Sequence, residues 1–247
     1  MRIIDAHIHL KHGDEAKTEY SPEEIVRVME VVGIEKSVVF AMSTSTKKSI
    51  EMAVRAARKY PDRLIPYVYA LPSFTEAVLS QIRVALTELG FKGIKIHAGE
   101  CTIAEYLINP VIELAGELGV PCLIDCLGRY GDLGRLAEMF PETKIIVAHM
   151  GRYLCRDAEL IDKFIQLAQR MDNVYLDVSG VVLTDKIVEA VRKIGAEKVI
   201  WGSDGPHRQP TTVDYAKREL DKVRKLPLKP EELEMVLGGS IAALLGI

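Results

Sequence analysis

The sequence is poor in cysteine and has no long apolar run, and each shortage excludes a class of protein. The four cysteines of the 247-residue chain form no Cys-x-x-Cys pair, which argues against a zinc knuckle or a thioredoxin-like motif. We therefore expect reduced thiols in a cytoplasmic protein. No apolar run reaches the roughly 20 residues that a membrane-spanning helix needs, so we predict no contact with a membrane.

The chain also lacks an excess of either charge. Lysine and arginine total 32, aspartate and glutamate total 35, and the formal net charge is −3. A nucleic-acid partner is not expected, because such proteins carry a basic patch or stripe. Only six residues are Asn or Gln, while Lys and Glu are abundant, a composition found in thermophilic proteins. We hold thermostability as a hypothesis and leave a homo-oligomer open.

What the chain does contain is a regular alternation of apolar runs and amphipathic helical patterns. Eight runs are predicted to be strands: Ile3–His9, Ser37–Phe40, Leu64–Tyr69, Gly93–His97, Cys122–Cys126, Lys144–His149, Val174–Val178 and Lys198–Gly202. Strands that are apolar throughout, each followed by a helix, are typical of a parallel sheet covered by helices. Eight such units close most simply into a (β/α)₈ TIM barrel, so we predict one α/β domain over residues 1–247. A doubly wound open sheet is the alternative, and the lack of a Gly-rich phosphate loop after the first strand disfavours it.

All six histidines fall at or just after the carboxyl end of a predicted strand. They are His7, His9, His12, His97, His149 and His207. In a barrel these ends meet on one face, where active sites are built. Residues two apart on a strand face the same side, so His7 and His9 both point into the mouth of the barrel, with Asp5 one layer deeper.

Two neighbouring imidazoles opposite a carboxylate form a suitable ligand set for a divalent metal such as zinc. A single His-x-His pattern is more often a pair of core histidines with satisfied hydrogen bonds. Here His149 and Asp204 stand at the ends of two other strands. Ionisable residues gathered at a barrel mouth seldom serve stability, so the combined pattern favours a metal site.

Seven segments, in order, carry a family resemblance over nearly the whole chain. They are IIDAHIHL, GFKGIKIHAG, GVPCLIDC, PETKIIVAHMG, NVYLDVSG, VIWGSDGPH and VLGGSIAALLGI. The sequence resembles the metal-dependent hydrolases of the amidohydrolase superfamily, in the amidohydrolase-related branch that also includes aromatic-acid decarboxylases. The resemblance implies a (β/α)₈ barrel whose metal is held by His7, His9 and Asp204. It implies that His149 is a further ligand or orients the attacking water.

The sequence departs from this family at the end of the fifth strand. The family usually has a histidine there, whereas this chain reads PCLID and places Asp125 at that position. A carboxylate can still bind zinc or manganese. Asp125 is therefore expected either to be a metal ligand or to orient a neighbouring histidine.

The roles of Lys95 and His97 also have more than one interpretation. In superfamily members with two metals a carboxylated lysine bridges the ions, but the resembling branch is mostly mononuclear, so we prefer one ion. Lys95 would then polarise a substrate oxygen or pair with a substrate carboxylate. The alternative is a lysine satisfied by Asp5 or Asp125 inside the barrel. His97 is expected to be a ligand or a substrate contact.

The predicted chemistry follows from the metal, with zinc the expected ion and manganese the alternative. A bound divalent ion lowers the pKa of a water ligand to about 7. Asp204 would take a proton from that water and pass it to the leaving group, while Lys95 or His149 helps to stabilise the oxyanion. We thus predict a metal-dependent hydrolase acting on an amide, lactone or ester bond.

The predicted substrate is small and carries a carboxylate. Three arginines follow predicted strands closely and are candidates for binding that carboxylate: Arg129, Arg152 and Arg208. Each one alone is more often a solvated loop residue. The first alternative function is a metal-dependent non-oxidative decarboxylase, a lyase, on the same site. The second is a non-catalytic metal-binding barrel, whose one support is Asp125 in the histidine position.

Overall fold

The structure, a computed structural model, describes residues 1–73, 77–101 and 104–247. Its strands are β1 (Ile4–Lys11), β2 (Lys36–Ala41), β3 (Leu64–Pro66), β4 (Val68–Tyr69), β5 (Ile94–His97), β6 (Cys122–Asp125), β7 (Ile145–Val147), β8 (Val174–Asp177) and β9 (Val199–Ile200). β1, β2 and β3 pair in parallel in chain order, and so do β4 to β9. Each of the eight predicted runs overlaps an observed strand. The third run is split at Tyr67 into β3 and β4.

The sheet closes into a barrel. The Ala6 N–H donates to the carbonyl of Trp201 at 3.2 Å, and the His9 N–H donates to the carbonyl of Gly205 at 2.7 Å. These bonds join the segment that follows β9 to β1, so the last strand lies beside the first. The predicted (β/α)₈ TIM barrel is confirmed, and the doubly wound open sheet is excluded.

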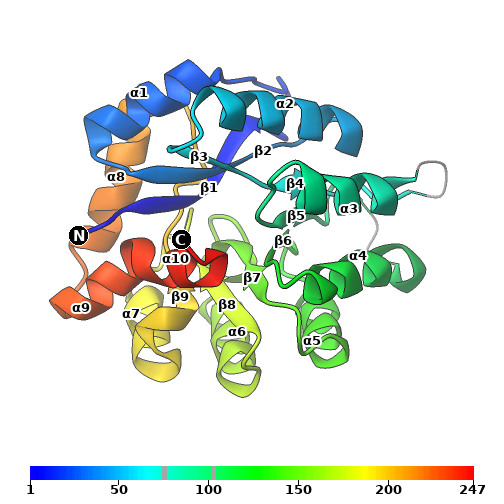
Figure 1. Cartoon of the computed structure of the whole chain (residues 1–247). Helices are drawn as coiled ribbons and strands as arrows, with labels where there is room; N and C mark the ends of the chain where they lie inside the picture. Colours follow the sequence, from blue (N-terminus) through cyan, green and yellow to red (C-terminus); the bar gives the residue numbers. More distant parts are fainter. Residues whose placement is uncertain (74–76, 102–103) are drawn as a thin grey trace.

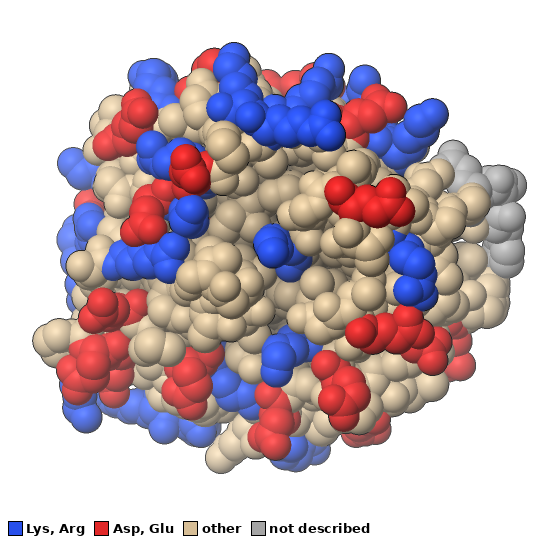
Figure 2. Space-filling model, in the orientation of Figure 1, with Lys and Arg blue, Asp and Glu red and all other residues tan. Residues whose placement is uncertain are grey.

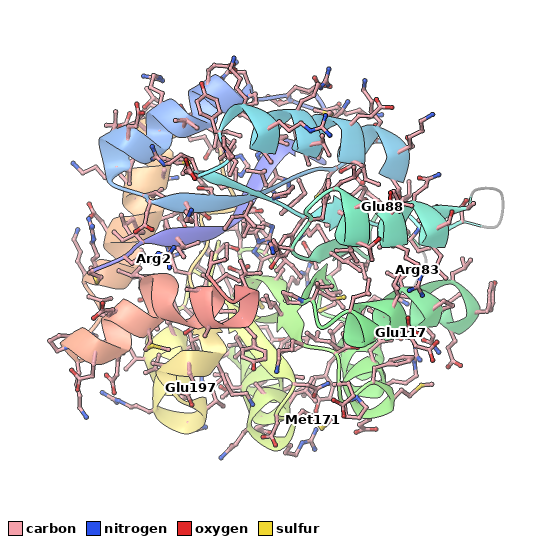
Figure 3. All side chains as sticks on the ribbon, viewed as in Figure 1. Arg2, Arg83, Glu88, Glu117, Met171 and Glu197 are labelled. Atoms are coloured by element: carbon pink, nitrogen blue, oxygen red, sulfur yellow. The ribbon has the colours of Figure 1, made fainter. Side chains whose placement is uncertain are left out.

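The helices α1 to α8 lie around the outside of the barrel (Figure 1). They are α1 (Pro22–Val32), α2 (Thr46–Lys59), α3 (Val78–Glu88), α4 (Glu105–Glu117), α5 (Tyr130–Met139), α6 (Ala158–Arg170), α7 (Thr184–Ile194) and α8 (Thr212–Arg224). Short segments complete the chain: η1 (Ala148–Gly151), η2 (Ala196–Lys198), α9 (Pro230–Glu234), η3 (Met235–Gly239) and α10 (Ser240–Leu245). Ion pairs link adjacent helices, as between Arg83 of α3 and Glu117 of α4 at 2.9 Å (Figure 3).

The boundaries of α1 show why the sequence folds locally as it does. The Ser21 hydroxyl oxygen accepts the Glu24 N–H at 3.1 Å, and Pro22 opens the helix. Gly33 ends it with a left-handed φ of 85°, a conformation that glycine adopts without steric cost. The charged face of the helix is left to water, while Ile25 and Met29 are buried against the barrel.

The C-terminal helix closes the end of the barrel where the strands begin. Ile241 of α10 packs in one apolar cluster with Ile4, Ile146 and Ile200, which point into the barrel. Figure 1 shows α10 lying across this end. This end is filled by apolar side chains, so the polar site has to be built at the opposite end.

The surface carries both signs of charge. On the face seen in Figure 2, basic and acidic side chains are interspersed. Among the helices of the described residues, none is both long enough and apolar enough to cross a membrane.

Candidate metal centre

All six histidines line a single cavity of about 280 Å³ at the carboxyl ends of the strands. The cavity is also lined by Gly13, Asp14, Met42, Lys95, Asp125, Leu127, Tyr153 and Asp204. Lys95 is the one lysine or arginine among these lining residues. The predicted gathering of ionisable residues at the barrel mouth is therefore present in the structure.

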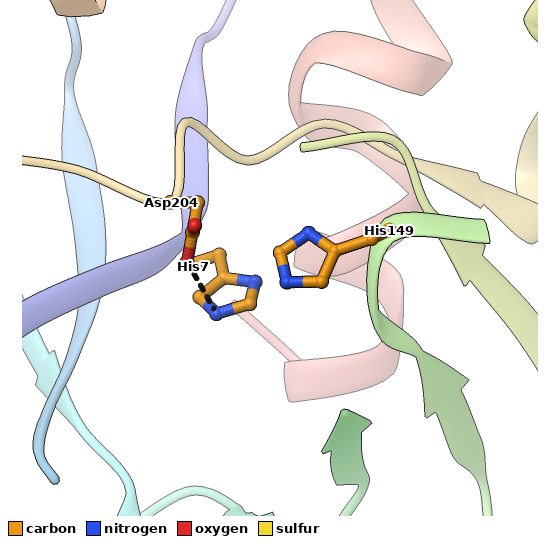
Figure 4. A group of neighbouring side chains, drawn as sticks. All are labelled: His7, His149 and Asp204. Atoms are coloured by element: carbon orange, nitrogen blue, oxygen red, sulfur yellow. Dashed lines mark ion pairs between the residues drawn. The ribbon is translucent and has the colours of Figure 1, made fainter. Parts of the chain in front are cut away.

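The centre of this cavity brings together two imidazoles and a carboxylate. One ligand atom each of His7, His149 and Asp204 lies within 4.8 Å of the others (Figure 4). The His7 Nε2 is 3.1 Å from the Asp204 Oδ1, and the His9 Nε2 is 2.9 Å from the same oxygen. Side chains from β1, from η1 and from the segment after β9 thus converge on one point.

The ring of His7 is oriented by partners on its far side. Its Nδ1 lies 3.0 Å from the Asp177 Oδ2, and Asp177 is fully buried. Burial raises the pKa of Asp177, but the hydrogen bonds from His7 and Ser179 outweigh it and lower that pKa to about 2. Asp177 is thus a carboxylate that accepts the Nδ1–H of His7, which leaves the Nε2 lone pair directed into the cavity. This is the tautomer that a metal-binding histidine needs.

His149 is oriented in the same way. Its Nδ1 lies 2.9 Å from the carbonyl oxygen of Ser179, so the Nδ1–H donates outward and the Nε2 faces the cavity. Burial lowers the pKa of His149, but Asp204 and Asp125 outweigh it and raise the pKa to about 9. At neutral pH the Nε2 of the metal-free protein therefore carries a proton that a metal ion must displace.

His9 differs from these two residues. Its burial, which the hydrogen bond of Asp204 only partly offsets, lowers its pKa to about 4, so the ring is neutral. Its Nδ1 is buried and has no hydrogen-bond partner among the described residues. The neutral ring donates its Nε2–H to the ionised Asp204 Oδ1 at 2.9 Å, so His9 contacts the cluster through Asp204.

Asp204 occupies an uncommon backbone position. Its φ is 58°, a left-handed conformation that costs a non-glycine residue about 1–2 kcal/mol. Such strain persists where the surroundings hold it, often at functional sites. Burial raises the pKa of Asp204, but the charge of His149 and the hydrogen bond from His9 outweigh it and hold that pKa well below its usual range. The Asp204 carboxylate is therefore ionised.

Asp125 lies between two histidines. Its Oδ2 is 3.3 Å from the His97 Nε2 and 3.4 Å from the His149 Nε2, and its Oδ1 accepts the Leu127 N–H at 3.0 Å. The group of mutually close ligand atoms does not include Asp125. Both of its predicted roles, as a metal ligand and as a residue that orients a neighbouring histidine, stay predictions.

Lys95 is buried inside the cluster, with its Nζ 3.1 Å from the His7 Nε2. Burial lowers the pKa of Lys95, and the charges of Asp125 and Asp204 oppose that shift. Asp5 is not its partner, because the Asp5 Oδ1 accepts the N–H groups of Ser203 and His7. Lys95 can therefore place a hydrogen-bond donor beside the predicted ligands.

The three arginines are not brought to the cavity. Arg129 pairs with Asp132 at 2.7 Å, and Arg208 lies 3.7 Å from Glu24. Arg152 is exposed, and the cavity lining includes none of the three. Their role in binding a substrate carboxylate stays a prediction without support from this geometry.

The residues present fit a divalent ion. Two Nε2 atoms with their ring protons directed outward and an ionised carboxylate form a nitrogen and oxygen donor set. Such a set suits zinc or manganese. A candidate metal site therefore exists, held chiefly by His7, His149 and Asp204.

Sequence reasoning missed the residues that orient the histidines, Asp177 and Ser179. The Ser179 hydroxyl donates to the Asp177 Oδ2 at 2.5 Å. A signal was present, because an Asp at the carboxyl end of the seventh predicted strand is as unusual as a histidine there. Sequence alone could not show that its partner is His7, 170 residues away.

Comparison with known proteins places this geometry in context. The family model described as amidohydrolase matches residues 4–247. No curated relative matches the sequence. Among solved structures, the chain is similar to an uncharacterised TIM-barrel protein from Bordetella bronchiseptica, with 17% identity, a TM-score of 0.79 and coverage of 100% of this chain and 99% of that one.

Two further similar structures have functional descriptions. A probable 2-pyrone-4,6-dicarboxylic acid hydrolase from Acinetobacter baumannii, with citric acid bound, shares 19% identity at a TM-score of 0.76 and full coverage of both chains. A dihydroxybenzoic acid decarboxylase from Polaromonas, with bound manganese and the inhibitor 2-nitroresorcinol, shares 16% identity at a TM-score of 0.73, covering 99% of this chain and 97% of that one. At these identities the likeness shows a shared fold.

Proposed function

The chain belongs to the amidohydrolase family, and from this premise we propose that it is a metal-dependent hydrolase acting on an amide, lactone or ester bond. The observation that carries the proposal is the convergence of His7, His149 and Asp204 in one cavity. A divalent ion held there supplies Lewis acidity and lowers the pKa of a bound water to about 7. Zinc is the proposed ion, with manganese as the alternative.

Asp204 is the proposed proton carrier. Its Oδ1 faces His7 and His9, while its Oδ2 lies 4.0 Å from the His207 Nε2. The Oδ2 can accept a proton from the attacking water and return it to the leaving group. Lys95 lies in the same cavity and stabilises the negative charge that develops on the substrate oxygen.

A single ion is favoured by the surroundings of the cluster. Lys95 is buried among the predicted ligands, and the Asp125 Oδ2 is engaged by the His97 Nε2 at 3.3 Å. A second cation would have to displace the lysine or take Asp125 from His97. We therefore propose one ion for each chain.

The proposed substrate is a small molecule that carries a carboxylate. The cavity of about 280 Å³ is at the small end of ligand pockets. Lys95 and the histidines supply donors for an anionic group. Two similar structures are also described as enzymes that act on carboxylic acids. One is a probable hydrolase of a dicarboxylic acid, and the other is a decarboxylase of a dihydroxybenzoic acid.

A metal-dependent decarboxylase is the second candidate, and one observation favours it. Lys95 lies in the cavity with its Nζ 3.1 Å from the His7 Nε2 and is not one of the predicted ligands. Its ammonium form could deliver the proton that replaces the lost carboxyl group. Product analysis separates the two reactions, because a hydrolase incorporates oxygen from ¹⁸O-labelled water and a decarboxylase releases carbon dioxide.

Metal analysis and metal removal test the function. We expect elemental analysis of the purified protein to find about one zinc or manganese per chain, and turnover of small lactones, esters and amides to stop with a chelator and return with the ion.

The Asp204→Asn variant should retain most of the metal yet lose turnover by about 10²–10⁴-fold, because the proton carrier is gone. Asp185→Asn, an exposed change on α7, is the matched control. Turnover of Asp204→Asn at the wild-type rate would contradict the assigned role, and the absence of a stoichiometric ion would contradict the function.

A further inference from the structure

The loop between β7 and α6 is held in a strained conformation that directs two side chains into the cavity. His149, Met150 and Leu154 have left-handed φ values of 57°, 50° and 49°. Such angles cost non-glycine residues about 1–2 kcal/mol each, and they persist only where surrounding contacts fix them. The loop brings both His149 and Tyr153 to the cavity lining. Sequence reasoning did not single out Tyr153.

The ring of Tyr153 is packed between two neighbouring residues. It meets the ring of His149 edge to face, with the centroids 5.1 Å apart. On its other side lies Gly180, with a φ of +63°, where an added Cβ would come within 2.4 Å of two Tyr153 ring carbons. The ring therefore needs a glycine at position 180, and the NVYLDVSG segment places one there.

The hydroxyl of Tyr153 is held next to Asp204 with a proton to donate. It lies close to the Tyr215 hydroxyl. Tyr215 donates its own proton to the carbonyl of Ser203 at 3.1 Å, so the Tyr215 oxygen is available to accept the proton of Tyr153. A tyrosine phenol, with an ordinary pKa of about 10, is protonated at neutral pH.

Resting on the proposed hydrolase function, we propose that Tyr153 is a further catalytic residue, whose hydroxyl donates a hydrogen bond to the anionic oxygen that develops on the substrate beside His149 and Asp204. The hydroxyl proton rotates freely about the C–O bond. An oxyanion is a stronger acceptor than the neutral Tyr215 oxygen, so the proton turns toward the substrate as charge develops. No proton is transferred, and Tyr215 positions the hydroxyl between turnovers.

A tetrahedral anion that mimics this charge tests the inference without any turnover. The probe is methylphosphonate, titrated calorimetrically into the full-length zinc-loaded protein after its zinc affinity has been measured by competition with a chelator. We expect Tyr153→Phe to weaken methylphosphonate binding about tenfold, equal to about 1.4 kcal/mol, with zinc affinity unchanged. Tyr175→Phe is the control, because Tyr175 packs near the opposite end of the barrel and should change neither affinity.

Tyr153→Leu separates the hydroxyl from the ring. If Tyr153→Phe binds methylphosphonate as the wild type does and only Tyr153→Leu is weak, the residue acts by packing on His149 and the inference is wrong. A fall in zinc affinity in Tyr153→Phe would also overturn it, as would a zinc-loaded wild-type protein that does not bind the anion. A wild-type protein that binds no zinc would instead overturn the proposed function.

Discussion

The candidate site depends on which nitrogen of each histidine faces the cavity. His7 and His149 both direct the Nδ1 outward, to Asp177 and to the Ser179 carbonyl. A ring fixed in this way offers its Nε2 without having to reorient, so binding an ion costs less conformational entropy. The residues that set this orientation are thus as important for the affinity as the ligands themselves.

Replacing Asp177 with asparagine tests this point. An amide cannot carry the negative charge that holds the Nδ1–H of His7, and its NH₂ group can face the ring in the wrong orientation. We expect Asp177→Asn to lower zinc affinity by about 10–100-fold, measured by competition with a chromogenic chelator. Asp185→Asn on the exposed face of α7 should leave the affinity unchanged. Equal affinities for Asp177→Asn and the wild type would show that Asp177 does not orient the ligand.

The buried carboxyl group of Asp5 predicts a pH dependence of the stability. Burial raises the pKa of Asp5 from the ordinary aspartate value of 3.8 to about 7. Between these values the folded chain keeps a proton that the unfolded chain has lost, so stability falls as the pH rises from about 4 to 7 and is level above that range. The total loss is on the order of 4 kcal/mol.

Asparagine at position 5 removes this dependence. The Asp5 Oδ2 has no partner among the described residues, so an NH₂ group can take its place while the oxygen keeps its two bonds. In the metal-free protein we expect Asp5→Asn to flatten the pH dependence and to be more stable than the wild type at pH 8, as measured by urea unfolding at several pH values. Curves for the two proteins that remain parallel from pH 4 to 8 would refute the assignment.

At the scale of elements, the strands were predictable and their ends were not. Apolar runs identify a buried strand because both of its faces are covered. The predicted run Lys144–His149 gives a strand of only three residues, Ile145–Val147, and then the turn of η1. The apolar pattern of this run is equally compatible with a strand that continues to His149. The turn is set by contacts of Gly151, where an added Cβ would lie 2.2 Å from the Phe164 ring, and such contacts are invisible in the sequence.

The strain in this loop can be measured at Leu154. Its side chain is 51% exposed and its φ is 49°, so little burial is lost on substitution. Asparagine tolerates this conformation better than leucine, and we expect Leu154→Asn to raise the free energy of unfolding by about 0.5–1 kcal/mol. Val182→Asn, at a residue 40% exposed and without a left-handed φ, should stay within about 0.5 kcal/mol of the wild type. A loss of stability in Leu154→Asn larger than in Val182→Asn would argue against stored strain.

At the scale of the whole molecule, closure of the barrel brings residues that are far apart in the sequence into contact. His7 and Asp204 are nearly two hundred residues apart, yet β1 lies beside the segment that follows β9. The sequence predicted this meeting from the rule that strand ends share one face of a barrel. It could not predict that the arginines would lie outside the cavity, because loop paths depend on contacts such as the Arg129–Asp132 pair.

This convergence predicts that metal binding stabilises the whole fold. The ligands come from β1, from η1 and from the segment after β9, so the unfolded chain cannot present them together. Zinc at about 100 times its dissociation constant should add about 2.7 kcal/mol, which for a chain of this size raises the melting midpoint by roughly 5–10 °C. The His7→Ala variant should show no such rise, and an equal rise there would place the ion elsewhere.

The scarcity of Asn and Gln makes a further prediction for the same calorimetric scans. We expect the metal-free protein to melt above the range of about 45–65 °C that is usual for mesophilic domains. A midpoint inside that range would contradict the thermophile hypothesis and would not affect the predicted stabilisation by zinc.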